Sequence, residues 1–227
     1  MSATAAERRE RLVALFKEVQ TCTRCPLHET RTKAVFGAGN ADADLMFVGE
    51  APGAEEDRQG LPFVGRAGQL LNQLLEEIGL SREEVFIANV LKSRPPGNRD
   101  PLPLEIQACE PYLFEQVRLI EPKVVCTLGN FATKLLTGSQ AGITRVRGTP
   151  QLHELGGRPV FLLPLLHPAA ALRTPAMKET LRADFATIPG LLAGPAPAPA
   201  PTAEQVAAED GPPQPEVPPA DQLGFFG

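Results

Sequence analysis

Apolar runs typical of buried strands alternate along this chain with amphipathic stretches of helical period. Strand-like runs occupy residues 44–49, 85–90 and 123–128, and residues 66–79 place their leucines on one helical face. Because a crossover helix packs back onto the sheet, strands that alternate with helices form a parallel sheet. The pattern therefore predicts an α/β fold with a mostly parallel sheet covered on both faces.

The remaining elements are expected in chain order. We predict helices at 4–20, at 104–120 with a restart at Pro111, at 130–136 and at 177–188, and a hairpin of strands 151–155 and 159–163. Ligands of parallel sheets bind beyond the carboxyl ends of the strands. Polar or glycine-rich loops follow the expected strand ends at 49–65, 89–103 and 167–173, so a functional site is expected there.

The 227 residues have a formal net charge of −5, but the acidity belongs to the end of the chain. Residues 194–227 hold five carboxylates and no Lys or Arg, which leaves 22 acidic and 22 basic side chains in residues 1–193. The net charge therefore does not argue against a nucleic-acid partner of the body. Basic side chains in loops are expected to face phosphate: Lys92, Arg94, Arg99, Arg145, Arg147 and Arg173.

Targeting segments are not expected. The chain has no run of eighteen apolar residues, and its start has no basic segment followed by an apolar one. These patterns predict neither a membrane-spanning helix nor a secretory signal. We therefore expect a cytoplasmic protein.

Proline and alanine dominate the chain from residue 194 onward. Such a segment has too few large apolar side chains to offset the entropy of ordering. We therefore expect a folded domain at 1–193 and a disordered, semi-stiff linker at 194–220.

The last seven residues, 221–227, differ from the linker because they contain Gln222, Leu223, Phe225 and Phe226. This pattern resembles the short peptides by which DNA replication and repair proteins bind the sliding clamp. We interpret residues 221–227 as a candidate clamp-binding peptide for which the linker provides reach. The alternative is a terminus without function.

The four cysteines are Cys22, Cys25, Cys109 and Cys126. Disulfides are not expected in a cytosolic chain, and the Cys22-x-x-Cys25 pair is typical of metal chelation. Four thiolates suit either zinc or an iron–sulfur cluster, and the spacing does not choose between them. A metal here would tie the amino-terminal helix to the body. The alternative is that Cys109 and Cys126 are small core residues.

The loops after the expected strands contain the residues that suit binding and catalysis. Glu50 lies in a glycine-bounded turn that lacks the phosphate-binding motifs. Phe63 offers a flat face for stacking a base, and the Asn89 amide both donates and accepts hydrogen bonds. His167 is the best placed of the three histidines to donate to a developing oxyanion. Residues 55–57 are acidic, which suits a solvated turn better than a magnesium nuclease.

Taken in order, the motifs 49–53 (Gly-Glu-Ala-Pro-Gly) and 62–65 (Pro-Phe-Val-Gly), Asn89, the motif 167–169 (His-Pro-Ala) and the four cysteines resemble the family 4 uracil-DNA glycosylases. The resemblance spans residues 22–185. It implies a three-layer α/β/α sandwich with a central, mostly parallel sheet. It also implies a [4Fe–4S] cluster held by Cys22, Cys25, Cys109 and Cys126.

The resemblance further implies a role for each site residue. Glu50, Ala51 and Pro52 form one wall of a uracil pocket, Phe63 stacks on the base, Asn89 binds the uracil edge and His167 contacts the side where charge develops. Glu50, Asn89 and His167 are the implied catalytic residues. Leu172 or Arg173 fills the space that the flipped base leaves, and Arg147 is a further expected DNA contact.

The implied activity is hydrolysis of the N-glycosidic bond of deoxyuridine in single- or double-stranded DNA, which starts base excision repair. A nucleoid-associated monomer is expected. Family 5 enzymes lack the glutamate of the first motif, so Glu50 argues against them. A covalent uracil-trapping relative has a His-containing insert, and residues 90–108 contain no His, which disfavours that interpretation. A rival interpretation is a non-catalytic, metal-stapled DNA-binding or clamp-adaptor protein, in which Phe63 and His167 are core residues.

Overall fold

A mixed sheet of six strands lies at the centre of the computed structural model, which describes residues 3–198. The strand order is β1-β3-β2-β4-β6-β5. The strands are β1 (Ala38–Gly39), β2 (Leu45–Gly49), β3 (Phe86–Asn89), β4 (Val124–Leu128), β5 (Gln151–Leu155) and β6 (Arg158–Leu165). The four inner strands are parallel, and β1 and β5 pair antiparallel at the two edges. The predicted mostly parallel sheet is confirmed.

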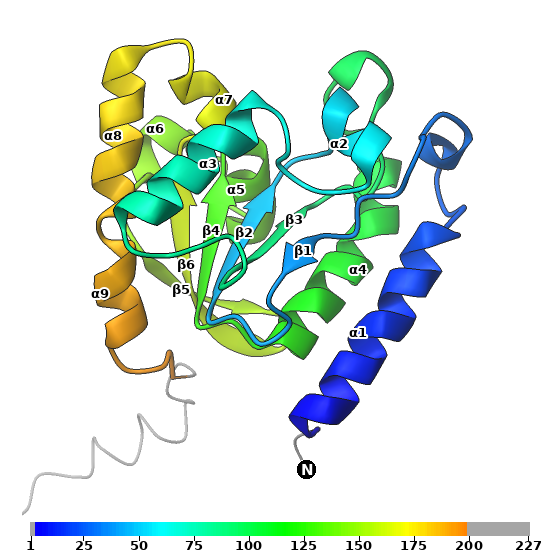
Figure 1. The fold of residues 1–227 in the computed structure, drawn as a ribbon, viewed down its shortest axis with the longest axis horizontal. Helices are drawn as coiled ribbons and strands as arrows, with labels where there is room; N and C mark the ends of the chain where they lie inside the picture. The colour runs from blue at the N-terminus through cyan, green and yellow to red at the C-terminus, as the bar shows by residue number, and fades with distance from the viewer. Residues whose placement is uncertain (1–2, 199–227) are drawn as a thin grey trace, which may run out of the picture. The chain divides into compact units, whose positions relative to one another are not determined.

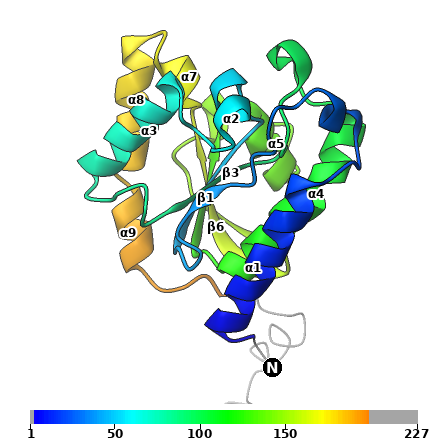
Figure 2. The same cartoon turned by 45° about the vertical axis from the view of Figure 1, so that its right-hand side comes forward.

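Helices cover both faces of this sheet. They are α1 (Ala5–Gln20), α2 (Ala54–Gln59), α3 (Arg66–Glu77), α4 (Pro103–Ile120), α5 (Asn130–Thr137), α6 (Ile143–Val146), α7 (Pro168–Ala171), α8 (Pro175–Phe185) and α9 (Ile188–Ala193). Helices α3, α8 and α9 lie on one side of the sheet, whereas α1 and α4 lie on the other (Figure 2). The three-layer α/β/α sandwich is therefore confirmed.

The parallel strands point toward the end of the sheet where α2 and α7 lie (Figure 1). The loops after β2, β3 and β6 therefore meet at this end, as expected for a ligand site in a parallel sheet. The short elements α2, α6, α7, α9 and β1 were not expected from the sequence, since two to six residues are too few to show a period.

Helix α4 differs from the prediction because it continues through Pro111 without a restart. A proline inside a helix removes one backbone hydrogen bond and crowds the preceding turn. In α4 this cost is offset by a long buried face that includes Cys109, Leu113 and Val117.

The core has two halves, one on each face of the sheet. Along β2, Met46 and Val48 pack toward α1 and α4, whereas Leu45 and Phe47 pack toward α3 and α8. The Phe47 ring stacks on the Phe185 ring of α8 with centroids 5.6 Å apart. Since successive strand residues point to opposite faces, a shift of one position moves a side chain from one half to the other.

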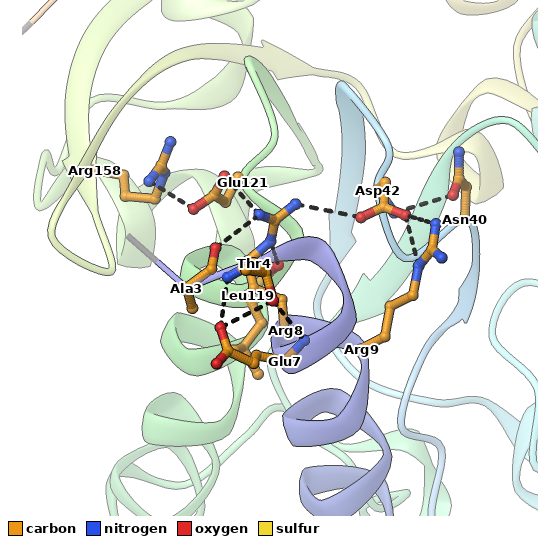
Figure 3. Close-up of polar contacts among 10 residues, drawn as sticks. All are labelled: Ala3, Thr4, Glu7, Arg8, Arg9, Asn40, Asp42, Leu119, Glu121 and Arg158. Atoms are coloured by element: carbon orange, nitrogen blue, oxygen red, sulfur yellow. Dashed lines mark hydrogen bonds and ion pairs between the residues drawn. The ribbon is translucent and has the colours of Figure 1, made fainter. Parts of the chain in front are cut away.

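Helix α1 is fixed to the body at its amino-terminal end by Arg8 (Figure 3). Arg8 donates to the Leu119 carbonyl near the end of α4 at 3.0 Å and to Asp42 at 3.3 Å. It also pairs with Glu121 at 3.4 Å, which Arg158 contacts from the other side at 2.9 Å. Leu12 and Val19 are buried against the core. The opposite end of α1 leads directly to Cys22 and Cys25.

Two expectations concern membranes and the tail. Within residues 3–198, no helix is both long and apolar enough to cross a membrane. The predicted linker lies outside the described residues from residue 199 onward, and so does the whole candidate clamp-binding peptide at 221–227.

Candidate active site

A cavity of about 500 Å³ opens at the carboxyl ends of the parallel strands. Its lining comes from the loops after β2, β3 and β6, as the strand pattern predicted. The lining residues are Glu50, Ala51, Pro52, Gly53, Glu56, Phe63, Ala67, Asn89, Pro95, Asn98, Arg99, His167, Ala169 and Arg173. All six residues predicted to bind uracil are among them, and we call this cavity the pocket.

The Phe63 ring is held by its own loop. Phe63 has a left-handed backbone conformation with φ of 50°, which is unusual for a bulky side chain. The Glu56 carboxylate accepts hydrogen bonds from the backbone N–H groups of Val64 at 3.0 Å and Gly65 at 3.1 Å. Arg82 donates to the carbonyl of Phe63 at 2.8 Å and to that of Pro62. These contacts hold the strained turn and present the ring to the pocket.

Two glycines allow the backbone to approach the pocket residues closely. A Cβ on Gly49 would lie 2.4 Å from Asn89 Oδ1 and 2.8 Å from the Phe63 ring. A Cβ on Gly68 would lie 1.7 Å from the Phe63 carbonyl oxygen. Any larger residue at either position displaces these groups. The glycine of the first motif therefore sets how close Asn89 and Phe63 lie to the end of β2.

Asn89 is the last residue of β3 and is only 2% exposed. No partner within residues 3–198 hydrogen-bonds its side-chain amide, which lines the pocket. The Lys92 ammonium donates to the Asn89 backbone carbonyl at 2.8 Å and to Gln116 Oε1 at 2.6 Å. Lys92 was expected to face phosphate, but it is buried, and burial lowers its pKa to about 7.

His167 caps α7 and stacks on Phe63. Its Nδ1 accepts a hydrogen bond from the Ala169 N–H at 3.1 Å. In the neutral ring this places the proton on Nε2, which is then a donor. The two ring centroids lie 5.7 Å apart with planes 29° from parallel. Burial lowers the pKa of His167 to about 4, against the opposing charge of Glu56, so the ring is neutral near pH 7.

Glu50 lies between the pocket and a second cavity of about 720 Å³. The two cavities share Glu50 and His167, and Asp100 lines the second one. Burial, together with the nearby charge of Asp100, raises the pKa of the Glu50 carboxyl. No other acidic residue borders both cavities within the described part of the chain.

The acidic segment 55–57 is not the solvated turn that we expected. It forms helix α2, in which Glu55 is exposed whereas Asp57 is buried. Asp57 accepts from the Thr32 backbone N–H at 3.0 and 3.1 Å, and Glu56 holds the Phe63 loop as described above. Both carboxylates therefore satisfy backbone donors. Glu56 is a pocket residue that sequence reasoning missed.

The predicted DNA contacts have different surroundings. Arg173 lines the pocket, and Leu172 beside it is 39% exposed. Arg147 instead pairs with the buried Asp184 at 2.5 Å and lines neither cavity. Arg99, which was expected to face phosphate, also lines the pocket, and so does Asn98, which the sequence analysis did not single out.

The structure brings three of the four cysteines together. Cys22 and Cys25 pack against the core half that contains Cys109, and the Lys92 N–H donates to Cys109 Sγ at 3.4 Å. Burial raises the pKa of the Cys109 thiol, and Cys25 and Cys22 raise it further by their charge. We call Cys22, Cys25 and Cys109 the cysteine group.

Cys126 lies in the other half of the core, toward α3 and α8. The sheet separates it from the cysteine group, and the four-cysteine ligand set stays a prediction. Within the described residues, no three or more Cys, His, Asp or Glu side chains are arranged around a single metal ion. An iron–sulfur cluster, which contains several irons, takes ligands that are spread further apart.

The fold and the pocket match the class that the motifs resemble. The sequence profile of the Uracil DNA glycosylase superfamily matches residues 36–187, and the chain belongs to this superfamily.

Named relatives narrow the assignment. The type-4 uracil-DNA glycosylase of Thermotoga maritima is 49% identical over 73% of this chain and 85% of its own length. Those of Sulfurisphaera tokodaii and Archaeoglobus fulgidus are 47% and 44% identical, over 76% and 79% of this chain and 80% and 92% of their own lengths. Within the superfamily, the chain belongs with the type-4 enzymes.

Proposed function

We propose that this protein hydrolyses the N-glycosidic bond of deoxyuridine in DNA, releasing uracil and leaving an abasic site that starts base excision repair. The observation that supports this most directly is the pocket, in which Phe63, Asn89 and His167 meet from segments at the carboxyl ends of β2, β3 and β6. The type-4 relatives support the same activity.

Base selection depends on Phe63 and Asn89. The Phe63 ring stacks on the flipped base, and Ala51 and Pro52 close the wall beside it. The Asn89 amide accepts from uracil N3–H and donates to uracil O4. Cytosine inverts both groups, so it leaves buried polar atoms unpaired, at a cost of about 1–3 kcal/mol for each.

Bond cleavage depends on His167. The bond between uracil N1 and deoxyribose C1′ breaks with both electrons leaving on uracil, and the sugar becomes oxocarbenium-like. The neutral His167 ring donates its Nε2 proton as a hydrogen bond to the oxygen where this negative charge develops. Water then adds to C1′ and loses a proton to solvent, which completes the hydrolysis.

Glu50 orients the attacking water in this scheme. Its carboxyl borders both cavities, and the raised pKa marks a site that is partly withdrawn from solvent. Arg173 contacts the phosphate backbone beside the pocket, and Leu172 fills the space that the flipped base leaves. Arg147 contributes less to DNA binding because Asp184 already neutralises it.

A [4Fe–4S] cluster is part of this proposal, as the resemblance to the family implies. Cys22, Cys25 and Cys109 fit such a cluster because they lie on one side of the sheet. When bound, the cluster links the segment after α1 to α4 as a structural staple. None of the catalytic steps above involves it.

The tail is proposed to be a tether. Residues 194–220 separate the catalytic domain at 1–193 from the peptide 221–227, which docks a sliding clamp through its apolar side chains. Deleting 221–227 is expected to abolish co-elution with the clamp while excision from short oligonucleotides stays unchanged. Binding that survives the deletion contradicts the docking. The protein is further proposed to act as a monomer at the nucleoid.

The deciding experiment incubates the protein with a single-stranded oligonucleotide that contains one uracil, and then treats it with alkali. Strand breakage at the uracil supports the glycosylase. A matched oligonucleotide with cytosine at the same position controls for base selection. Intact DNA from folded protein contradicts the proposal and favours the non-catalytic DNA-binding alternative.

A further inference from the structure

The cysteine group provides three thiolates, whereas the cluster proposed above has four irons to ligate. Cys22 and Cys25 follow α1, and Cys109 lies on the buried face of α4. All three pack in the same half of the core. The question is therefore which side chain of this chain is the fourth ligand.

Cys126 is excluded by the direction of its side chain. In β4, Val125 packs with Cys109, whereas the flanking residues Val124 and Cys126 pack with the helices on the opposite face. Cys126 pairs with Phe47 of β2 and Leu163 of β6, both of which face the same way. Bringing its sulfur to the cysteine group requires a shift of β4 by one residue, which exchanges every buried side chain of that strand.

Ser93 is 3% exposed, and its surroundings place it beside the cysteine group. It directly follows Lys92, whose backbone N–H donates to Cys109 Sγ. The Ser93 hydroxyl accepts from Arg31 Nη1 at 3.1 Å, and Arg31 Nη2 donates to the Gln20 carbonyl at the end of α1 at 3.0 Å. Ser93 therefore follows the residue that contacts Cys109, and its hydroxyl is linked through Arg31 to the segment that leads to Cys22.

The surroundings of Ser93 suit an oxygen ligand. A serine hydroxyl must lose its proton when it binds iron, and the Arg31 guanidinium stabilises the resulting negative oxygen. Other oxygen and nitrogen groups nearby are already engaged, since Tyr112 donates to Glu18 at 3.2 Å and His28 Nδ1 bonds the Cys25 carbonyl at 2.8 Å.

We propose that Cys22, Cys25 and Cys109 ligate three irons of the cluster and that Ser93 ligates the fourth through its hydroxyl oxygen, while Cys126 is a core residue. This inference rests on the cluster in the proposed function. On binding, the Ser93 O–H bond breaks, an oxygen–iron bond forms and the proton passes to solvent. Oxygen is a harder ligand than sulfur, so this iron site differs electronically from the other three.

The test measures iron content and Mössbauer spectra of the full-length protein purified without oxygen. The wild type is expected to hold four irons, one of them spectroscopically distinct. Ser93→Cys is expected to keep four irons and lose the distinct site, and Ser93→Ala is expected to lose one iron. Cys109→Ala loses most of the iron, whereas Cys126→Ala, the matched control, keeps the wild-type content and spectrum.

Several outcomes overturn the assignment. Loss of iron in Cys126→Ala makes Cys126 a ligand, and an unchanged spectrum in Ser93→Ala removes Ser93. If Tyr112→Phe or His28→Ala abolishes the distinct site, that residue is the fourth ligand instead. Uracil excision is assayed on the same preparations. If the wild type contains no iron but excises uracil, the proposed cluster is wrong and the proposed activity stands. If it contains iron but does not excise uracil, the proposed activity is wrong and the proposed cluster stands.

Discussion

Close backbone approach places the side chains of the pocket, whereas long-range side-chain packing places those of the cysteine group. Gly49 allows Phe63 and Asn89 to lie close together at one end of the sheet, and the carboxylate of Glu56 fixes the loop that contains Phe63. The cysteine group draws instead on the end of α1 and the middle of α4, which are distant in sequence. Segment 89–93 joins the two regions, since Asn89 faces the pocket and Lys92 contacts Cys109.

This difference predicts different responses to substitution. A change in the pocket is expected to alter catalysis with little effect on folding, because the residues there project into a cavity. A change around the cysteine group or α1 is expected to alter stability or iron content, because those residues hold separate segments together. The predictions below test this division.

The largest effect is expected for His167→Ala. Removing the Nε2 donor withdraws the hydrogen bond to the leaving uracil anion, and loss of one such donor typically slows a reaction by about 100- to 1000-fold. Single-turnover excision from a uracil oligonucleotide measures it, with His153→Ala as the control. A decrease of less than tenfold shows that His167 does not stabilise the anion.

Gly49→Ala tests whether backbone approach sets the pocket geometry. The added Cβ would lie 2.4 Å from Asn89 Oδ1, so Asn89 or the Phe63 ring must move. Misplacing a binding group by about 1 Å can cost about 100-fold in rate, and we expect a loss of this order. Gly190→Ala in α9 is the control, because no atom beyond its own helix backbone and chain neighbours lies within 4 Å of its Cβ position in the described part of the chain. Wild-type activity in Gly49→Ala contradicts this account.

The strands and the pocket residues were predictable because each is encoded by a short segment. Apolar runs marked β2, β3 and β4. Glu50, which follows β2, and Asn89, which ends β3, lie at the carboxyl end of a parallel sheet regardless of exact register. The face of Cys126 was not predictable, since its direction depends on the position where β4 begins to pair. A Cys at position 125 rather than 126 would face the cysteine group. Composition and cysteine spacing do not fix the register of a strand to within one residue.

Carboxylate roles in α2 were also hidden from the sequence. Glu56 and Asp57 look like solvated charges in a polar run, but their partners are backbone N–H groups at 32, 64 and 65. Backbone donors leave no mark in the sequence. The same holds for Lys92, whose charge suggested phosphate binding and whose burial follows from Asn89 and Gln116.

The pH dependence of stability distinguishes the partly buried His167 from an exposed histidine. Its pKa falls from an ordinary value near 6.5 to about 4 on folding, so between these values the unfolded state binds a proton that the folded state does not. The contribution of His167 to the free energy of unfolding is therefore fully present above pH 6.5 and is lost as the pH falls toward 4. Glu50 acts in the opposite sense, since its pKa is raised in the folded state.

Denaturant midpoints measured from pH 7 to pH 4 test this, with the other charged pocket residues Glu56, Arg99 and Arg173 left in place. His167→Gln removes the titrating group. As the pH falls from 7 to 4, the denaturant midpoint of this variant is expected to decline less steeply than that of the wild type. An identical decline in both proteins shows that His167 titrates normally.

The smallest effect is expected at α1, where Arg8 and Arg9 share the partner Asp42. Arg8 also bonds the Leu119 carbonyl and Glu121, and it is 18% exposed, whereas Arg9 is 63% exposed. We expect Arg8→Ala to lower the free energy of unfolding by about 1–2 kcal/mol and Arg9→Ala by less than about 0.5 kcal/mol. Neither should change excision, since α1 does not line the pocket. Equal values for the two variants, measured in iron-loaded protein, place the attachment of α1 at the cysteine group rather than at Arg8.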